Sequence, residues 1–378
     1  MRFIICLGMV SLFADITYEG ARSISGPFLK GLGATAAQVG FIAGLGEFIG
    51  YALRLVSGTI ADRTRSYWTI TIVGYTVNLF AVPLMSFAGS WQAAALLVAA
   101  ERAAKGMRAP ARDVLLSEAA NRVGRGWGFG LHAAMDQIGA VVGPLFVAWS
   151  VARANGYAPA LLRLAIPAAC AIGALLIARM FDITGVSAVP VNRTPQVLPH
   201  VFWIYVAAAG LLAMGYADFP LVAFHFEEAG LMKPAMIPLM YTVAMAANGI
   251  TAPLFGKLFD RFGLVVLPVG ILISMAALPL NFLGGMDAAL AGVFCWGTGM
   301  GAMDAVLRSG VSDIVSMNKR GRAFGLFNFV YGAMWLAGSS AMGLLYERSI
   351  LALVILGMLS QLASAAIFFG LRGKLNAA

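Results

Sequence analysis

A six-residue pattern occurs twice in the 378-residue chain, each time at the end of a long apolar run. Residues 58–63 read GTIADR and residues 256–261 read GKLFDR, 198 positions apart. A second pair, RGWGFGL at 125–131 and RGRAFGL at 320–326, is 195 positions apart. Similarity at about half the chain length, within apolar helical sequence, indicates an internal duplication. We therefore expect a chain of two similar halves with the working site between them.

The hydrophobic content indicates that this duplicated chain lies in a membrane. Hydrophobic residues make up 60% of the sequence, charged residues make up 11%, and the mean hydropathy is +0.85. A soluble core cannot bury that much apolar surface, whereas a bilayer can. The formal net charge of +9 arises mainly at the predicted loops. It is therefore a signal of membrane topology and gives no support for nucleic-acid binding.

The apolar runs predict an all-α integral membrane protein with twelve transmembrane helices, arranged as two six-helix pseudo-repeats. A spanning helix needs about 20 mostly apolar residues. The runs that meet this need are 3–28, 37–60, 67–88, 92–116, 126–152, 159–181, 200–226, 235–258, 264–285, 288–313, 321–346 and 350–371. The predicted domains are an N-terminal six-helix bundle, a cytoplasmic linker rich in proline and polar residues, and a C-terminal six-helix bundle, at 1–181, 182–199 and 200–378.

The basic residues predict the orientation. Most lysines and arginines of the predicted loops lie on the side that carries both termini, the linker 182–199 and both copies of the repeated pattern. The positive-inside rule places that side in the cytoplasm. We expect a multi-pass protein of the plasma (inner) membrane. Because two fused halves form a complete pathway, we expect it to function as a monomer.

Several classes of chemistry have no support in the sequence. The cysteines Cys6, Cys170 and Cys295 are far apart in apolar runs, which indicates neither a disulfide framework nor a metal site. A glycine-rich phosphate cradle and a metal-ligand cluster are also missing from the sequence. We expect no cofactor, no metal and no ATP drive. The three histidines show no local nucleophile–base pattern, so we expect no enzyme activity.

Together, these motifs resemble those of the major facilitator superfamily over nearly the whole chain. GTIADRTRS at 58–66 is similar to the superfamily's loop between its second and third helices, and GKLFDRFG at 256–263 is its echo in the second half. Arg102-Ala-Ala-Lys105-Gly106 matches the arginine and glycine pattern of helix four. Gly130, Gly139 and Gly143-Pro144 resemble the antiporter motif of helix five in drug exporters, although Val147-Ala148 replaces its trailing glycine pair.

The resemblance to the drug and metabolite antiporter branch implies further roles. Gly130, Gly139, Gly143 and Pro144 are expected to pack helices closely and to bend helix five. The repeated pattern is expected to hold one conformational state closed at the cytoplasmic mouth, although ordinary loop charges are the alternative. The expected residues of this cytoplasmic gate are Gly58, Asp62, Arg63, Arg112, Asp113, Asp136, Asp260 and Arg261.

Ionisable residues inside the predicted helices are candidates for function, since each costs roughly 2.5–3.5 kcal/mol to insert into a bilayer. Asp15, Glu19 and Arg22 share one face of the first helix because they are four and seven residues apart. The full set of candidates for proton coupling or substrate binding is Asp15, Glu19, Arg22, Glu101, Arg102, Lys105, Arg108, Asp218, Asp304 and Arg308. The resemblance implies that the helices carrying them, namely the first, fourth, seventh and tenth, line a central cavity.

Two interpretations stay open for several of these residues. Asp15 and Glu19 are candidates to carry a proton, or to pair with Arg22 or helix four. Lys105 and Arg108 are candidates to contact substrate, or to pair with Glu101 or Asp15. We place Glu47 and Arg54 in pairing between helices, and His225 at the outer interface.

The sequence favours a secondary transporter that exchanges protons for a small organic compound and exports it by alternating access. The alternative is an importer of an organic anion. Lys105, Arg108 and Arg112, which form a basic stripe along the predicted helix 92–116, favour this alternative. A membrane enzyme, a receptor and a channel fit the repeat less well.

Overall fold

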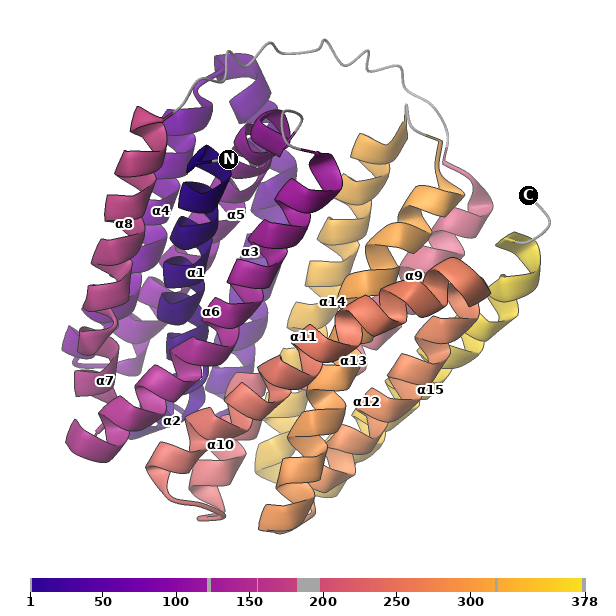
Figure 1. Cartoon of the computed structure of the whole chain (residues 1–378). Helices are drawn as coiled ribbons and strands as arrows, with labels where there is room; N and C mark the ends of the chain where they lie inside the picture. Colours follow the sequence, from indigo (N-terminus) through magenta and orange to yellow (C-terminus); the bar gives the residue numbers. More distant parts are fainter. Residues whose placement is uncertain (1, 121–123, 155, 182–197, 317–318, 376–378) are drawn as a thin grey trace. The chain divides into compact units, whose positions relative to one another are not determined.

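The computed structural model describes residues 2–120, 124–154, 156–181, 198–316 and 319–375, which fold almost entirely into helices (Figure 1). The first group of elements is α1 (Arg2–Arg22), α2 (Ser25–Gly31), α3 (Ala36–Thr64), α4 (Tyr67–Leu84), η1 (Met85–Phe87), α5 (Trp91–Ala120), α6 (Arg125–Ala154), α7 (Tyr157–Arg163) and α8 (Ala165–Met180). The second group is α9 (His200–Gly215), α10 (Phe219–Glu228), η2 (Pro234–Met236), α11 (Ile237–Phe262), η3 (Gly263–Val265), α12 (Val266–Phe282), α13 (Met286–Ile314), α14 (Arg320–Arg348) and α15 (Ile350–Leu375).

Each predicted apolar run coincides with a helix or with a pair of consecutive helices, so the all-helical prediction is confirmed for the described residues. The pairs arise because the runs 3–28, 159–181 and 200–226 are each interrupted. Between α9 and α10, Tyr216 and Asp218 have extended backbone, with ψ of 110° and 140°. Pro220 follows in the first turn of α10, where a missing N–H costs no helical hydrogen bond.

Nine stretches among the described residues are long and apolar enough to cross a membrane. One of them, Pro234–Phe282, covers two of the predicted runs. The runs 92–116 and 321–346 are not among them. Helix α5 falls short because six ionisable residues lie between Glu101 and Asp113. The arrangement of twelve spans in two repeats therefore stays a prediction, and most of the predicted linker, residues 182–197, lies outside the described part of the chain.

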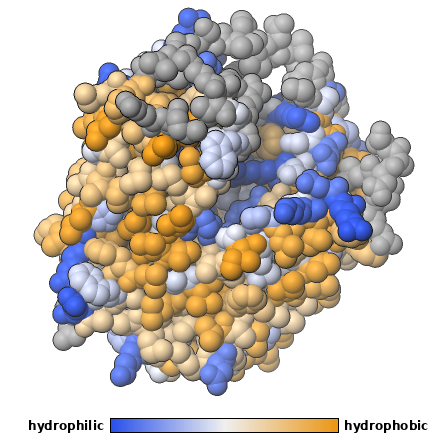
Figure 2. Space-filling model, viewed as in Figure 1, coloured by the Kyte–Doolittle hydropathy of each residue, from blue (hydrophilic) through white to orange (hydrophobic). Residues whose placement is uncertain are grey.

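The surface is consistent with a lipid environment. Figure 2 shows hydrophobic residues over most of the visible coloured surface, with the hydrophilic residues in separate groups. Large apolar side chains stand exposed on many helices, with Leu96 at 72% and Ile250 at 73% exposure. Exposed apolar surface of this extent is unfavourable in water and favourable against lipid tails.

The chain divides into two compact units. Unit 1 is Met1–Ala34, Ile49–Pro190 and Met232–Thr242, and unit 2 is Thr35–Phe48, Val191–Leu231 and Val243–Ala378. Unit 1 thus includes the start of α11, and unit 2 includes the first half of α3. The division follows contacts within the chain, and the predicted domain boundaries stay a prediction.

In unit 1, α1 packs along α6 and α8, and α4 packs along α5. Glycines on α6 allow the contact with α1. A Cβ on Gly143 would lie 2.6 Å from the carbonyl oxygen of Ile16, and one on Gly139 would lie 2.8 Å from the Cβ of Asp15 and would also overlap the carbonyl of Leu12. Only residues without a side chain permit backbones to approach this closely.

In unit 2, α9 packs against α14 and α15, and α12 packs against α13 and α15. Polar side chains on α15 join these helices. The Gln361 amide donates a 2.8 Å hydrogen bond to the carbonyl of Gly215 and accepts a 2.6 Å bond from Ser274, while Ser364 donates a 2.7 Å bond to the carbonyl of Ala208. These bonds satisfy backbone and side-chain groups that would otherwise be buried without partners.

Candidate functional site

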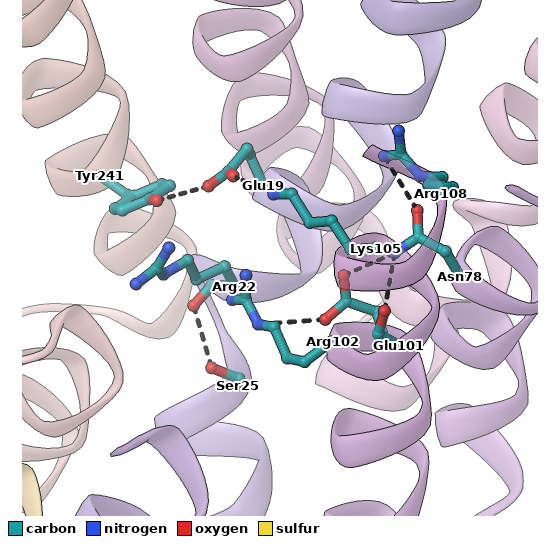
Figure 3. A network of polar contacts seen from close by, with 9 residues as sticks. All are labelled: Glu19, Arg22, Ser25, Asn78, Glu101, Arg102, Lys105, Arg108 and Tyr241. Atoms are coloured by element: carbon teal, nitrogen blue, oxygen red, sulfur yellow. Dashed lines mark hydrogen bonds and ion pairs between the residues drawn. The ribbon is translucent and has the colours of Figure 1, made fainter. Parts of the chain in front are cut away.

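Glu19 on α1 joins three helical segments of unit 1. Its Oε2 accepts a 2.6 Å hydrogen bond from the phenol of Tyr241 at the start of α11. Its Oε1 lies 3.5 Å from the ammonium of Lys105 on α5. That ammonium also lies 3.6 Å from the ring centre of Tyr18, which is a cation–π distance. Figure 3 shows Glu19 between Tyr241 and Lys105. The Glu19 carboxylate is therefore held by a base and a hydroxyl.

Glu101 on α5 has its own set of partners, also drawn in Figure 3. Its Oε2 lies 3.1 Å from Nε of the neighbouring Arg102. Its Oε1 accepts a 2.7 Å hydrogen bond from the amide of Asn78 on α4, which also donates a 3.1 Å bond to the backbone carbonyl of Glu101. Glu101 is 4% exposed. These contacts tie α4 to α5 and make Glu101 a fixed charge.

Arg108 is the largest fully buried side chain of the described residues. Its guanidinium lies 3.8 Å from the ring centre of Tyr75 and donates a 3.4 Å hydrogen bond to Asn78. Within the described part of the chain, neither Glu101 nor Asp15 comes within ion-pair distance of it. The partners of Arg108 are therefore an amide and an aromatic ring of α4 and, at 5.9 Å, the ring of Tyr18 on α1, in place of the acids that the sequence offered.

Asp15 differs from Glu19 although both lie on one face of α1. Its side chain is 5% exposed, beside Gly139 of α6. Among the described residues, no donor or base lies within hydrogen-bond or ion-pair distance of its carboxyl group. Lys105 and Arg108 act on it only as charges at longer range. Asp15 is thus a buried carboxyl group without a direct partner in unit 1.

The remaining unit 1 candidates lie around Glu19. The guanidinium groups of Arg22 and Arg102 interact electrostatically with it. The backbone carbonyl of Arg22 accepts a 3.0 Å hydrogen bond from the hydroxyl of Ser25, across the break between α1 and α2 (Figure 3). The seven candidates of unit 1 comprise four bases against three acids, a difference of +1, and they are Arg22, Arg102, Lys105, Arg108, Asp15, Glu19 and Glu101.

The candidates of unit 2 form separate pairs. Asp218, 1% exposed at the break between α9 and α10, accepts hydrogen bonds of 2.8 Å from the Trp335 indole and 3.3 Å from the Ser339 hydroxyl. Asp304 on α13 accepts a 3.0 Å bond from the amide of Asn248. The remaining candidate, Arg308, lies on α13 one turn after Asp304. His225, which the sequence places at the outer interface, has its Nδ1 2.9 Å from the Tyr346 hydroxyl.

The predicted gate residues lie partly at helix ends and partly inside helices. Asp62 and Arg63, at the end of α3 in unit 1, are exposed, and Asp62 accepts a 3.3 Å hydrogen bond from the hydroxyl of Tyr67. Arg112 pairs with its neighbour Asp113 at 2.8 Å. The others are exposed Asp260 and Arg261, at the end of α11 in unit 2, and Asp136 on α6, paired with His132 at 3.3 Å. Their role in gating stays a prediction.

The glycines of the sequence motifs have unequal surroundings. Gly139 and Gly143 lie against α1, and Pro144 follows them inside α6. A Cβ on Gly58 would make an ordinary 3.7 Å contact with Pro110. In contrast, a Cβ on Gly130, or on Gly256, would meet no described atom within 4 Å. Close packing therefore requires glycine at only part of the helix-five motif.

Neutral residues that the sequence reasoning missed complete the site. Tyr18 follows Asp15 by three residues, which places it on the charged face of α1, so helical spacing could have identified it. Asn78 is the one amide in the otherwise apolar run of α4, which is a signal of buried hydrogen bonding. Tyr241 gave no such signal because 222 residues separate it from Glu19. Within the described ranges, no group of three or more histidine, cysteine, aspartate or glutamate residues could hold a metal ion.

The long apolar helices and the ionisable groups buried among them define a multi-pass membrane protein of the transporter class. The chain matches the Major Facilitator Superfamily over residues 6–339 and therefore belongs to that family. It is a transporter and not an enzyme. The predicted resemblance is thus confirmed at the level of the superfamily.

Relatives and solved structures agree with this assignment. The chain is 40% identical over 98% of its length, and 93% of the relative's, to the uncharacterized protein Rv2265 of Mycobacterium tuberculosis. It is 24% identical to the uncharacterized MFS-type transporter MJ1317 of Methanocaldococcus jannaschii, over 91% of this chain and 88% of that one. The nucleoside transporter NupG has a similar fold, with a TM-score of 0.75, 13% identity and full coverage of both chains. A bacterial homolog of the human lysosomal transporter Spinster gives a TM-score of 0.71 and 14% identity, over 99% of this chain and 95% of that one.

Proposed function

We propose that this protein is a proton-coupled secondary transporter that exports a small organic compound by alternating access, as a monomer in the plasma (inner) membrane with both termini in the cytoplasm. The observation that carries the coupling is the contrast between Asp15 and Glu19. A carboxyl group that carries a proton must be able to lose and regain it without dismantling its surroundings. Asp15 meets this need because no described base or donor is bonded to it, whereas Glu19 is tied to Lys105 and Tyr241.

The positions of the candidate residues beside interrupted helices support a binding site there. Interrupted helices at corresponding positions of two repeats are a sequence and structural sign of a transporter binding site. The break between α1 and α2 directly follows Arg22, and the break between α9 and α10 contains Asp218. The first break lies at residues 23–24 and the second at 216–218, a separation close to that of the sequence repeat.

The remaining candidates receive roles from their contacts. Lys105 has a long ion pair with Glu19 and a face-on contact with Tyr18, both of which a substrate could replace. It is therefore the substrate contact that we favour in unit 1. Arg108, Glu101 and Arg102 have partners along α4 and α5, and we assign them to the support of the site. Asp62, Arg63, Asp260 and Arg261 are proposed to stabilise the closed cytoplasmic mouth.

The second candidate function is import of an organic anion. Among the seven candidates of unit 1 there is one more base than acid, and this favours import because an anionic substrate would neutralise that charge. Under this alternative Lys105 still contacts the substrate, and the proton on Asp15 enters the cell together with it.

A transport assay tests the proposal. A thermal-shift screen of the purified protein first identifies a compound that stabilises it. Uptake of that compound is then measured in inside-out and right-side-out vesicles under an imposed pH gradient. Export predicts gradient-dependent accumulation in inside-out vesicles, and accumulation only in right-side-out vesicles would show import instead.

The Asp15→Asn variant tests the coupling residue. We expect it to lose accumulation against a gradient while it still exchanges labelled for unlabelled compound, because the substrate pathway is intact and the proton site is lost. Glu19→Gln is the matched comparison on the same face of α1. It removes a tied charge, so we expect it to weaken binding of the compound. Full gradient-driven uptake by Asp15→Asn would exclude Asp15 as the coupling group.

A further inference from the structure

A buried histidine and an aspartate form a pair on α6 that the transport cycle described above does not use. His132 and Asp136 are four residues apart, and Nδ1 of the imidazole lies 3.3 Å from Oδ1 of the carboxylate. The His132 side chain is 4% exposed and the Asp136 side chain 36% exposed. Nε2 of His132 is buried without a hydrogen-bond partner among the described residues. The pair thus combines a buried imidazole with a carboxylate whose Oδ1 is buried and whose side chain as a whole is partly exposed.

The pair lies next to Asp15 along the contact between α1 and α6. Gly139, three residues after Asp136, is where α6 touches Asp15. Ser11, four residues before Asp15 on α1, lies close enough to act on the Asp136 carboxylate. Because α1 and α6 pack along one another, Asp15, Asp136 and His132 follow in order along this contact, toward the start of α6. The carboxyl groups of Asp15 and Asp136 also interact electrostatically.

Charged groups on α5 face the same row. Arg108 interacts electrostatically with both Asp15 and Asp136, and Arg112 interacts with Asp136. Lys105 acts on Asp15. Glu19 acts on it from the same face of α1. The two acids therefore compete for the same bases, so a proton placed on one of them changes the field at the other.

We propose that the His132–Asp136 pair is a second proton-binding site, which takes up the proton that Asp15 releases and passes it to water on the side where α6 begins. The proposal rests on the proposed proton coupling at Asp15. The proton leaves a carboxyl oxygen of Asp15 and binds the Asp136 carboxylate, directly or through the Ser11 hydroxyl. Asp15 is left as a carboxylate facing Lys105 and Arg108.

The imidazole of His132 gives this second site a group that can hold the proton. When Asp136 passes the proton to Nδ1 of His132, an imidazolium forms beside a carboxylate, and only O–H and N–H bonds have changed. Histidine is suited to this step since it exchanges protons near neutral pH. The proton then returns from Nδ1 to the Asp136 carboxylate, whose side chain is 36% exposed, and passes from there to water.

Nuclear magnetic resonance tests the coupling without any substrate, because the chain has only three histidines. The full-length protein is labelled with ¹⁵N in its imidazole rings, and the His132 signal is assigned by its loss in His132→Gln. The ring nitrogens distinguish imidazole from imidazolium. His225 in unit 2 is the internal control, and its signals should not respond to changes at Asp15 or Asp136.

Three variants give the expected results. At a fixed pH where both forms of His132 are present, Asp136→Asn should lower the ratio of imidazolium to imidazole by about tenfold or more, because a carboxylate at ion-pair distance favours the charged ring by at least that factor. In the parent protein the His132 signal should change in two steps as the pH is lowered, since the two acids titrate together with it. Asp15→Asn should reduce this to one step. Asp136→Glu, which keeps the charge, should restore the imidazolium signal.

The proposal is overturned if His132 does not change its protonation between pH 5 and pH 9, or if its titration curve is the same in Asp15→Asn as in the parent. Such a result leaves gradient-driven transport, and thus the proposed function, standing. In contrast, if the histidine responds to Asp15 but the vesicle assay shows transport independent of the proton gradient, then the proposed function fails and the pair is an ion pair that serves structure. Unchanged His200 and His225 signals identify variants that fold normally.

Discussion

Tyr241 donates a 2.6 Å hydrogen bond to Glu19, which joins the start of α11 to α1 within unit 1. The donor is fully buried at 1% exposure and the acceptor is a carboxylate at 9% exposure. A bond between a hydroxyl and an ionised acid at this distance is among the stronger hydrogen bonds of proteins. It fixes one oxygen of Glu19 and leaves the other for Lys105.

Removal of this hydroxyl should destabilise the protein without altering its charge. Tyr241→Phe leaves Glu19 with one partner fewer, and hydrogen bonds to charged groups contribute about 1.5–3 kcal/mol to stability. We expect a lower melting temperature of the purified protein in detergent. We also expect easier displacement of Lys105, and therefore a changed affinity for the compound found in the thermal-shift screen.

The matched control is Tyr205→Phe in unit 2. Its hydroxyl is also buried, but it donates a 2.9 Å hydrogen bond to the backbone carbonyl of Leu307. This variant should lower the melting temperature without changing the affinity for the compound. An unchanged melting temperature and affinity in Tyr241→Phe would show that the bond to Glu19 has no role in the site.

The contact between α1 and α6 makes a prediction about packing. Gly143→Ala would place a methyl group 2.6 Å from the Ile16 carbonyl and 3.0 Å from the Gly20 nitrogen, so the two helices must separate. Overpacking of this kind costs about 1–3 kcal/mol. We expect a lower melting temperature and slower transport, because a shift of α1 displaces Asp15 as well.

Gly130→Ala is the control on the same helix. The added methyl group meets no described atom within 4 Å, and alanine is favoured over glycine inside a helix by about 0.5–1 kcal/mol. We therefore expect equal or higher stability. If both variants melt at the same temperature, then close packing at Gly143 is not a requirement of the fold.

The C-terminal end of α3 gives a prediction about conformational state. Asp62 accepts a hydrogen bond from Tyr67 across the turn between α3 and α4. If Asp62 helps to hold one state closed, then Asp62→Asn should shift the balance of inward-open and outward-open states. The measurement is the rate at which single cysteines, introduced along α5 in a background without Cys6, Cys170 and Cys295, react with a water-soluble thiol reagent.

Tyr67→Phe is the control for that measurement, because it removes the hydrogen bond and keeps the charge of Asp62. A shift in Asp62→Asn alone indicates that the charge matters. Equal shifts in both variants indicate that the local bond matters. The same reaction rates in Asp62→Asn and the parent protein would count against a gating role.

Much of the fold could be predicted from the sequence because helix positions in a membrane depend on local composition. The run 92–116 predicts α5 closely, since polar residues and glycine or proline bound each apolar stretch. The interruptions of runs 3–28 and 200–226 were not predicted. Each lies inside a single predicted run, beside Arg22 in the first and at Asp218 in the second, and the break at Tyr216–Asp218 is accompanied by the hydrogen bonds that Trp335 and Ser339 donate to Asp218.

The candidate site was predictable only by residue type. The charged residues Glu101, Lys105 and Arg108 of α5 are buried or half-buried, as the sequence pattern predicts, because charge in an apolar helix is rare. Their partners were not predictable. Glu101 bonds to Asn78, Lys105 lies near Glu19, and Arg112 pairs with Asp113, so one face of a helix serves three different neighbours. Which neighbour each charge meets is decided by tertiary contacts that helical spacing does not contain.

The start of α3 gives a prediction about pH. Glu347 at the end of α14 accepts a 2.9 Å hydrogen bond from the backbone N–H of Ala37, and both residues belong to unit 2. The hydroxyl of Thr35 also donates to this carboxylate, and this bond is the main reason that the pKa of Glu347 lies below its ordinary value, with the Ala37 N–H as the second cause. A carboxylate at a helix start also satisfies N–H groups that have no partner within the helix.

The lowered pKa of Glu347 decides whether the stability of the protein rises or falls with pH. A group whose pKa is lowered by folding stabilises the folded state wherever it is ionised, so its contribution is complete above the unfolded value of about 4.3. The contribution is lost as the pH falls through the lower folded value. We expect the melting temperature of the parent protein to fall more steeply between pH 5 and pH 3 than that of Glu347→Gln, and the two curves to run parallel above pH 6. Curves that stay parallel down to pH 3 would show that Glu347 does not stabilise the start of α3.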